Sequence, residues 1–501
     1  MSTHVELRAG AYHDSVSLMQ VSRAVAGTPG VQAAQVAMAT ELNVDVLRSM
    51  GFTVPPEAGP NDLVIALRTD TPDAVAPGLA AVADALAGLR ATSDSGGGDE
   101  VVAPRTLGSA AARAGATLAV ISVPGQHAVT EAFDAIASGL SVMLFSDNVS
   151  VEDEVALKDA AAAADVLVMG PDCGTAHIGG VALGFANVVR PGSVGIVAAS
   201  GTGAQQVMCL LDAAGVGLSH CLGVGGRDLK ADVGGRSTKQ ALRALADDPA
   251  TEGVIVVSKP PDGAVLAEVE AEAAALGLRV HWAVLGAGRP DLTASVEDFL
   301  RGEGHVVPSW PSWPATAPES DRADLVQGSA LRGLFCGGTL ADEAMTIAEG
   351  ELGGIRSNIP HDPALALGPD LRDDGHVIID FGDDGMTRGR AHPMIDPTLR
   401  QERIAAEALD PTCGVLLLDL VLGHGAHPDP AGELADAVRA ARATALAAGR
   451  VLPVVVSLTG TEGDPQGRAR CAQVLADAGA SVHLSNAAAT RTALTLLRSA
   501  R

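Results

Sequence analysis

Two short turns rich in glycine carry hydroxyl groups, and each follows an apolar run typical of a buried strand. The first reads ASGTG at 199–203 and the second CGGT at 336–339. A turn that leads from a strand into a helix presents unpaired backbone N–H groups and the positive end of the helix dipole, which suit a phosphate or a carboxylate. A helix cap with close strand–helix packing explains a single turn of this kind equally well. The predicted phosphate-binding residues are Ser200, Gly201, Thr202, Gly203, Gly337, Gly338 and Thr339.

A third glycine turn, LGHGAHPDP at 422–430, follows the apolar run Val415–Leu422. In α/β proteins ligands bind at the carboxyl ends of the strands, which is where this turn lies. Histidine there can act as an acid, a base or a carrier of phosphate. We therefore predict His424 as a catalytic residue and Gly425 as part of the phosphate site, although a capped, solvated loop would have the same sequence.

Two polar glycine loops, Gly223–Ser237 and Asp380–Pro393, mix acidic and basic residues as a loop around a charged substrate does. Their basic side chains are the natural partners of a carboxylate, although a solvated charge is the commoner outcome for any one of them. Asp383, Asp384 and His392 match no specific ligand spacing, so no metal site is predicted. The predicted carboxylate-binding residues are Arg227, Lys230, Arg388 and Arg390.

The elements that hold the first two turns form an internal repeat. Gly195–Met208 recurs as Gly333–Met345, and Asp248–Ser258 recurs as Asp410–Asp419. Leu276–Gly286 recurs in the same order as 447–460. The matches predict two copies of one doubly wound domain, in which apolar strands form a parallel sheet covered on both faces. Chance similarity within a sequence rich in Ala, Val and Gly is the alternative.

The rest of the chain predicts an α/β protein with a small α+β module at its N-terminus. Continuous βα units begin at Ala116, and two stretches without apolar periodicity, Ala91–Asp99 and the proline-rich Pro308–Ser320, read as linkers. Trp310 and Trp313 are placed to fix the second linker to a domain surface. In the module we predict strands at His4–Arg8, Val31–Met38 and Leu63–Arg68, and helices at Asp14–Ala26 and 72–89.

Composition excludes several classes of function. With 501 residues and 47% apolar content the chain can bury several cores, and the formal charge of −26 opposes binding to nucleic acid or to anionic lipid. There is no signal-peptide pattern and no apolar run of about 18 residues, so we expect a cytoplasmic protein. Six cysteines without a CxxC pair predict reduced core residues. The four lysines, all between 158 and 259, are explained by base composition better than by a functional cluster.

These segments resemble a known family. The run from 116 to 286 looks like the α subunit of succinyl-CoA synthetase, with VISVPG, GPDCG, VGIVAASGTGAQQV and GVGGRDLKAD, and the block from 333 onward looks like the ligase domain of its β subunit. A single chain that joins these parts, with DSVSLMQVS near its start, resembles the FdrA family of acyl-CoA-synthetase-like proteins. The implied domains are a small α+β module (1–90), a degenerate Rossmann-like CoA-binding domain (100–190), an α-type flavodoxin-like ligase domain (191–305), a linker (306–325) and a β-type ligase domain (326–501).

Three departures separate the sequence from the synthetases. No segment corresponds to the ATP-grasp domain, the early glycine-rich CoA turn is missing, and no histidine follows the strand His281–Leu285 where the phosphate carrier should stand. The FdrA resemblance implies instead a subunit of an oxamate carbamoyltransferase of allantoin catabolism, which exchanges oxamate and carbamoyl phosphate with oxalurate and phosphate. Carbamoyl phosphate is an acyl phosphate, so helix-end phosphate sites would be kept while ATP and CoA sites are lost.

Two alternatives stay open from the sequence. One is an acid–thiol (acyl-CoA) ligase, related to succinate–CoA ligase, that takes ATP-grasp activity from another chain, and CoA is a cofactor under this alternative alone. The other is a scaffold subunit that keeps the fold without turnover. In each case we expect other protein subunits of the same complex as partners, and for an enzyme a small acyl phosphate and a carboxylate as substrates.

Overall fold

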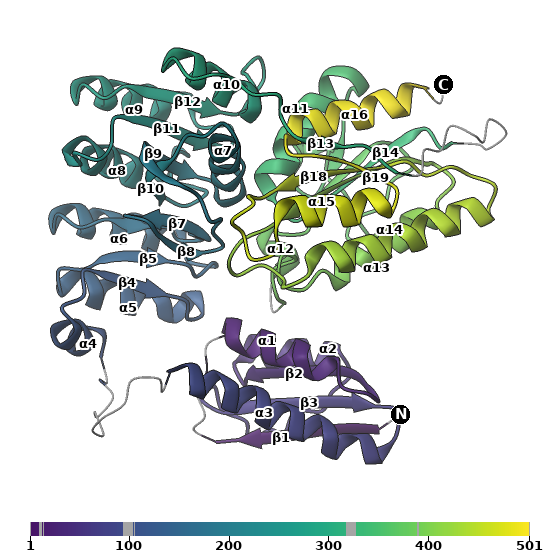
Figure 1. Cartoon of the computed structure of the whole chain (residues 1–501). Helices are drawn as coiled ribbons and strands as arrows, with labels where there is room; N and C mark the ends of the chain where they lie inside the picture. The colour runs from purple at the N-terminus through teal and green to yellow at the C-terminus, as the bar shows by residue number, and fades with distance from the viewer. Residues whose placement is uncertain are drawn as a thin grey trace. The chain divides into compact units, whose positions relative to one another are not determined.

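The computed structural model describes residues 2–9, 13, 15–93, 104, 106–316, 327–387 and 390–499. They form two compact units, one of residues 1–106 with 387–391, and one of 107–386 with 392–501 (Figure 1). None of the helices in these ranges combines the length and apolar character needed to cross a bilayer.

The N-terminal unit is an antiparallel sheet of order β1-β3-β2 with helices on both faces. Alternate residues of β3 point to opposite faces, because side chains alternate along a strand. Leu63, Ile65 and Leu67 pack with α1 and α3, whereas Val64 and Ala66 pack with α2. The predicted α+β module is therefore confirmed. Its elements are β1 (Ser2–Arg8), α1 (Ser15–Ala26), β2 (Val31–Met38), α2 (Glu41–Ser49), β3 (Leu63–Thr69), the 3₁₀ turn η1 (Pro72–Ala74) and α3 (Val75–Ser93).

The second unit begins with a small parallel sheet of order β4-β5-β6. Small residues of α5, including Ala128 and Ala132, pack on Val142 and Leu144 of the sheet. The aliphatic composition thus produces a close helix–sheet layer without aromatic residues. The elements are α4 (Leu107–Ala114), β4 (Leu118–Ile121), α5 (Gly125–Ala137), β5 (Ser141–Leu144), α6 (Val151–Ala163) and β6 (Val168–Met169).

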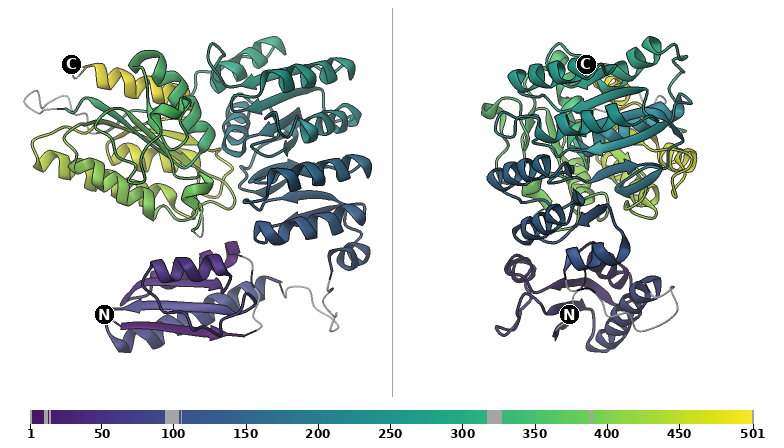
Figure 2. Two further views of the ribbon diagram at one scale, coloured as in Figure 1. Left: turned by 180° about the vertical axis from the view of Figure 1, so that it is seen from behind. Right: turned by 90° about the vertical axis from the view of Figure 1, so that its left-hand side faces the viewer.

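Copy one of the repeat, residues 175–302, is a sheet of order β12-β11-β9-β10-β7-β8. Helices α7 and α10 cover one face and α8 and α9 the other, as Figure 2 shows. The elements are β7 (Thr175–Ile178), β8 (Val181–Gly184), β9 (Pro191–Ala199), α7 (Gly201–Ala213), β10 (Leu218–Gly223), α8 (Arg236–Asp247), β11 (Gly253–Ser258), α9 (Gly263–Ala275), β12 (Val280–Val284) and α10 (Leu292–Gly302).

Copy two, residues 330–499, contains the order β18-β17-β14-β16, which repeats β12-β11-β9-β10 of copy one. All of these neighbours are parallel, so the repeat seen in the sequence is a repeat of topology. The elements are β14 (Ala330–Phe335), α11 (Gly338–Leu352), β15 (Arg356–Ser357), the 3₁₀ turn η3 (Pro363–Leu365), β16 (Val377–Asp380), α12 (Asp384–Thr387), α13 (Thr398–Leu409), β17 (Cys413–Val421), α14 (Pro430–Ala447), β18 (Val454–Thr459), α15 (Arg468–Asp477), β19 (Ala480–His483) and α16 (Asn486–Ser499).

Both predicted linkers need correction. The first overlaps α3, which runs to Ser93, and the rest of that linker lies outside the described residues. The second contains β13 (Ser312–Trp313), an edge strand of copy two that pairs with β19. Trp313 packs against the copy-two core, and the Trp310 indole donates to Glu297 at 2.8 Å. The described part of this linker is therefore fixed by its two tryptophans.

The two copies pack through α7 and α10 of one against α11 and α16 of the other. Gln206 on α7 donates to Leu484 O at 2.9 Å and accepts from Thr459 Oγ1 at 2.7 Å. In the repeat alignment Glu343 on α11 stands where Gln206 stands on α7. It accepts from Leu292 N at 2.6 Å and from Asn486 Nδ2 at 2.7 Å. Each copy therefore contributes a buried polar side chain at a matching place in the interface.

This interface predicts a pH-dependent stability. Burial, helped by Asp291, raises the pKa of Glu343 from 4.5 to about 7. Between these values the folded chain binds the proton that the unfolded chain has lost, so stability falls as pH rises. We expect Glu343→Gln, which stays neutral, to be more stable than wild type at pH 8 by on the order of 1–3 kcal/mol, with a smaller difference at pH 5.

Thermal unfolding at both pH values measures this difference. Glu351→Gln, an exposed change on the same helix, is the matched control and should leave the pH dependence unchanged. A wild type and a Glu343→Gln variant whose melting temperatures respond identically to pH would contradict the assignment.

Candidate functional site

The two glycine turns meet at the interface between the copies. Ser200 caps α7 by accepting from Gly203 N at 2.9 Å, and its Oγ lies 2.5 Å from Thr339 Oγ1 at the start of α11. A Cβ on Gly337 would lie 3.0 Å from Thr202 atoms, and one on Gly203 would lie 3.0 Å from Thr339 Cγ2. We call these residues, 200–203 and 337–339, the junction.

Parts of the junction are occupied by the protein's own groups. Cys336 N and Gly337 N donate to the two oxygens of Asp419, at 2.8 and 2.9 Å, and Arg400 pairs with that carboxylate at 2.7 Å. The N–H groups of Gly203 and Gly337 are therefore already bound within the fold. The N–H groups of the first turn of α11, Gly338–Leu340, have no partner inside the helix, and no side chain caps this helix with a hydrogen bond.

Two charged residues that the sequence reading did not select converge on Gly338. Lys259 directly follows β11, and Asp380 ends β16. A Cβ on Gly338 would lie 2.5 Å from Asp380 Oδ2 and 3.0 Å from Lys259 Nζ, although the two charges form no ion pair. The signal that points to them is their place at the carboxyl ends of parallel strands.

Asp380 is 3% exposed, and Gly382 N donates to its Oδ1 at 2.8 Å. Burial raises the pKa of this carboxyl to about 6, with Asp383 and Asp419 adding to the rise, while Lys259 and the Gly382 N–H oppose it. Its Oδ2 makes no hydrogen bond to another described residue. A carboxylate with such a pKa can accept a proton near neutral pH.

His392 lies beside the same loop. Its Nδ1 accepts from Met394 N at 3.2 Å, its ring centroid is 5.5 Å from that of Phe185, and a Cβ on Gly382 would lie 2.8 Å from its Nε2. Burial lowers the pKa of His392 to about 4, so the ring is neutral at pH 7. With Nδ1 acting as acceptor, Nε2 carries the hydrogen and can donate to a ligand.

The predicted carboxylate-binding residues are spread out. Arg227 donates to Glu154 at 2.9 Å and to Val149 O at 2.9 Å, and Lys230 donates to Pro260 O at 2.8 Å. Arg388 lies outside the described residues. Arg390 is exposed and belongs to the segment 387–391, which is grouped with the first unit. The described contacts bring none of Arg227, Lys230 and Arg390 to the junction.

The loop that holds His424 is attached to copy one. His424 N donates to Ala186 O at 2.8 Å, and a Cβ on Gly425 would lie 3.0 Å from the Phe185 ring. The His424 imidazole is exposed and makes no hydrogen bond to another described residue. The second histidine of this turn, His427, is buried, and its Nδ1 accepts from Asp429 N at 3.0 Å.

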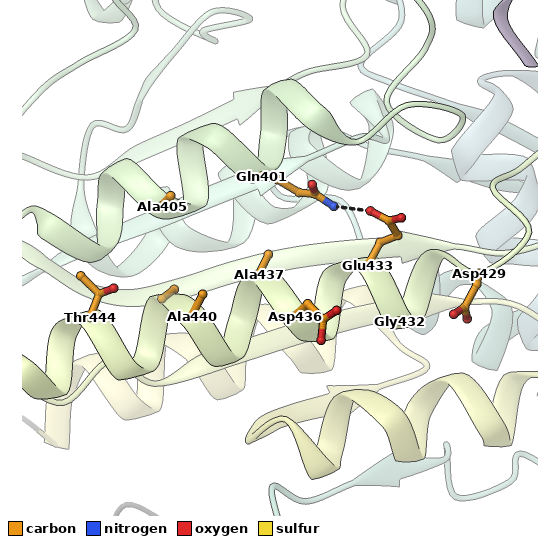
Figure 3. Close-up of a pocket in the computed structure, with 10 residues that line it drawn as sticks. Gln401, Ala405, Asp429, Gly432, Glu433, Asp436, Ala437, Ala440 and Thr444 are labelled. Carbon is orange, nitrogen blue, oxygen red and sulfur yellow. Dashed lines mark hydrogen bonds between the residues drawn. The ribbon is translucent and has the colours of Figure 1, made fainter. Parts of the chain in front are cut away.

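A surface pocket of about 540 Å³ lies away from the junction, between α13 and α14 (Figure 3). Its carboxylates include Asp429, Glu433 and Asp436, and its floor is formed by alanines. Gln401 Nε2 donates to Glu433 at 3.1 Å across it. Such a lining repels an anionic substrate, and none of the predicted site residues contributes to it.

The six cysteines are free and buried, as predicted. Burial raises the pKa of the Cys173 thiol to about 12, so it is not a thiolate at neutral pH. Among the described residues no three His, Cys, Asp or Glu side chains form a group that could hold a metal ion.

Comparisons with known proteins agree with this architecture. Residues 1–103 match the family model "AllF, heavy metal-associated domain", and residues 334–496 match "CoA-ligase". Residues 1–103 contain no cysteine, and the described part of the chain offers no metal-binding cluster, so the residues do not fit the metal in that domain's name.

Part of the chain is 30% identical to subunit alpha 2 of an ADP-forming succinate–CoA ligase of Archaeoglobus fulgidus, over 32% of this chain and 58% of that subunit. Among solved structures, a dinucleotide-forming acetyl-coenzyme A synthetase 1 of Ca. Korarchaeum cryptofilum matches at 17% identity, with 76% of this chain and 83% of that chain covered. Its TM-score of 0.28 is too low to support an argument.

The Escherichia coli (strain K12) protein YahF is 40% identical over 496 residues, which cover 96% of this chain and 95% of YahF. A match of this length includes the AllF-type N-terminal domain, the small parallel sheet and both copies of the repeat. The chain therefore belongs to the family of YahF, in which an AllF-type N-terminal domain is joined to a CoA-ligase domain related to succinate–CoA ligase.

Proposed function

We propose that the chain is a subunit of an oxamate carbamoyltransferase, which converts carbamoyl phosphate and oxamate to oxalurate and phosphate. The observation that supports this most is the 2.5 Å contact between Ser200 and Thr339, which brings the starts of α7 and α11 together. The AllF-type N-terminal domain is a second support, because its name points to allantoin metabolism.

The phosphate of carbamoyl phosphate would lie at the first turn of α11, beside Lys259. Each helix end contributes on the order of 0.3–1 kcal/mol to binding of an anion at an exposed position, and up to about 2 kcal/mol when partly buried. The cation of Lys259 adds to this, since Gly338 has no side chain to separate it from the helix. Ser200, Gly201, Thr202 and Thr339 complete the proposed phosphate site, while Gly337 and Gly203 shape it.

The substrate carboxylate needs a second set of donors. The neutral Nε2–H of His392 is one such donor, because a Cβ on Gly382 would lie 2.8 Å from this nitrogen. His424 stays a proposal for proton transfer, made from the sequence. Partner subunits are part of the proposal too, because the resemblance to the FdrA family implies a carbamoyltransferase made of several proteins.

A CoA ligase is the second candidate, and the CoA-ligase match at 334–496 is the observation that favours it. In this case the chain would bind CoA and the junction would hold an acyl phosphate made with ATP by a partner. A scaffold without turnover would show neither reaction.

The first test separates these candidates. The chain is incubated with carbamoyl phosphate and oxamate, alone and with the proteins encoded next to it, and released phosphate is measured. We expect release that depends on oxamate and is unaffected by CoA. Release that requires ATP, CoA and succinate instead would support the ligase, and no release in either mixture would support the scaffold.

The second test uses the glycines. Neither Gly338 nor Gly350, which lies further along the same helix, has a positive φ, so what matters at each is the approach of neighbouring atoms. A Cβ on Gly338 would displace Asp380 and Lys259, whereas one on Gly350 would meet nothing within 4 Å. We expect Gly338→Ala to fold but to reduce phosphate release strongly, and Gly350→Ala, the matched control, to release phosphate near the wild-type rate. Equal rates in the two variants would contradict the placement of the anion at Gly338.

A further inference from the structure

Lys259 differs from the other three lysines of the chain in its surroundings. Lys158 is buried with Glu154 and Asp228, each at 2.7 Å, and Lys239 pairs with Glu268 at 2.8 Å. Lys230 donates to a backbone carbonyl. Lys259 is half-buried and has no hydrogen bond or ion pair with any described residue. Its ammonium acts electrostatically on three carboxyl groups, those of Asp172, Asp380 and Asp384, and opposes the rise in the pKa of each. Because none of them forms an ion pair with it, an anionic ligand can still pair with this partly buried charge.

Asp380 faces the same point and is also incompletely paired. Its Oδ1 accepts one N–H, whereas Oδ2 points to the start of α11 without a hydrogen bond to a described residue. The charged groups that shift its pKa are Lys259 after β11, Asp383 in its own loop and Asp419 on β17, which Arg400 holds. Asp172 and Asp384 interact with the same lysine, and their own pKa values are raised chiefly by burial. The nearby His392 is neutral at pH 7.

We propose, on the basis of the carbamoyltransferase function above, that Lys259 and Asp380 are the reacting pair of this site: Lys259 binds the phosphoryl group of carbamoyl phosphate, and Asp380 accepts the proton that the amide nitrogen of oxamate loses. The two roles need a cation and a base side by side that do not neutralise each other. That is the arrangement around Gly338.

The reaction balances with these groups alone. The oxamate nitrogen attacks the carbamoyl carbon, a C–N bond forms and the C–O bond to phosphate breaks. The proton from nitrogen moves to Asp380 and then to the released phosphate, which leaves as hydrogen phosphate. The N–H groups of Gly338–Leu340 and the Lys259 ammonium stabilise the charge on the leaving group as it develops.

Four variants of the full chain test the pair: Lys259→Met, Lys259→Arg, Asp380→Asn and the control Lys239→Met. Circular dichroism and thermal unfolding first establish that each is folded. Binding of inorganic phosphate to the chain alone is measured by calorimetry, and phosphate release is measured in the complex across pH 5–8. Binding of phosphate does not depend on the identity of the acceptor.

We expect Lys259→Met to weaken phosphate binding about tenfold or more, Lys259→Arg to restore part of it and Lys239→Met to leave it unchanged. Asp380→Asn should bind inorganic phosphate at least as well as wild type, because a negative charge is removed. Its rate of phosphate release from carbamoyl phosphate should be about 10²- to 10⁴-fold lower, because the base is lost. In wild type kcat/KM should fall below pH 6 as Asp380 becomes protonated, and Asp380→Asn should lose this acid limb.

The outcomes test the roles of Lys259 and Asp380 separately from the carbamoyltransferase function. If wild type releases phosphate from carbamoyl phosphate and both Lys259→Met and Asp380→Asn behave like wild type, the assignment of the reacting pair is wrong and the function stands. If wild type shows no turnover but its phosphate binding depends on Lys259, the carbamoyltransferase function and the role of Asp380 fail, while the anion site of Lys259 stands. A wild-type chain that binds no phosphate overturns the assignment of Lys259.

Discussion

The face-to-face packing of α7 on α11 is the constraint on which the rest of the second unit depends. Two helices can bring their first residues into contact only when the turns before them are small, and here glycine at 203 and 337 lets Ser200 and Thr202 approach the opposite turn. The N-terminal ends of two helices both carry a partial positive charge and therefore repel each other. Asp419 offsets part of this repulsion by accepting two N–H groups at the second turn, and Arg400 holds that carboxylate in place.

The duplication supplies a symmetric scaffold, but the chemistry on it is asymmetric. Gly223 pairs with Ala198 in the sheet of copy one, and Asp380 pairs with Phe335 in the sheet of copy two. Ala198 and Phe335 occupy equivalent positions before the two glycine turns. Copy one therefore has a glycine where copy two has the buried acid. Conversely, the unpaired cation, Lys259, comes from copy one. A cation and an acid that come from different copies are held apart by the packing of the copies, so they do not collapse into an ion pair.

The sequence alone was sufficient for the repeat and for strands followed by glycine turns and helices, because apolar strands and glycine turns are local signals that recur in order. It does not predict the partners of charged side chains. Arg227 was selected from a polar loop, yet its partner Glu154 lies 73 residues earlier and takes its guanidinium. Lys259 and Asp380 were passed over, because what marks them is a shared neighbour, Gly338, that is distant in sequence. No periodicity predicts which charges of a loop find partners.

A polar interface persists between the two aliphatic domains because its buried polar side chains are hydrogen-bonded. Gln206 and Glu343 occupy matching places on α7 and α11, and each is bonded to the opposite copy. Gln206 is neutral, whereas Glu343 has a raised pKa and is therefore in part protonated near pH 7. Burial and the nearby Asp291 both oppose the ionisation of Glu343, so the interface between the copies is most stable when this side chain is neutral.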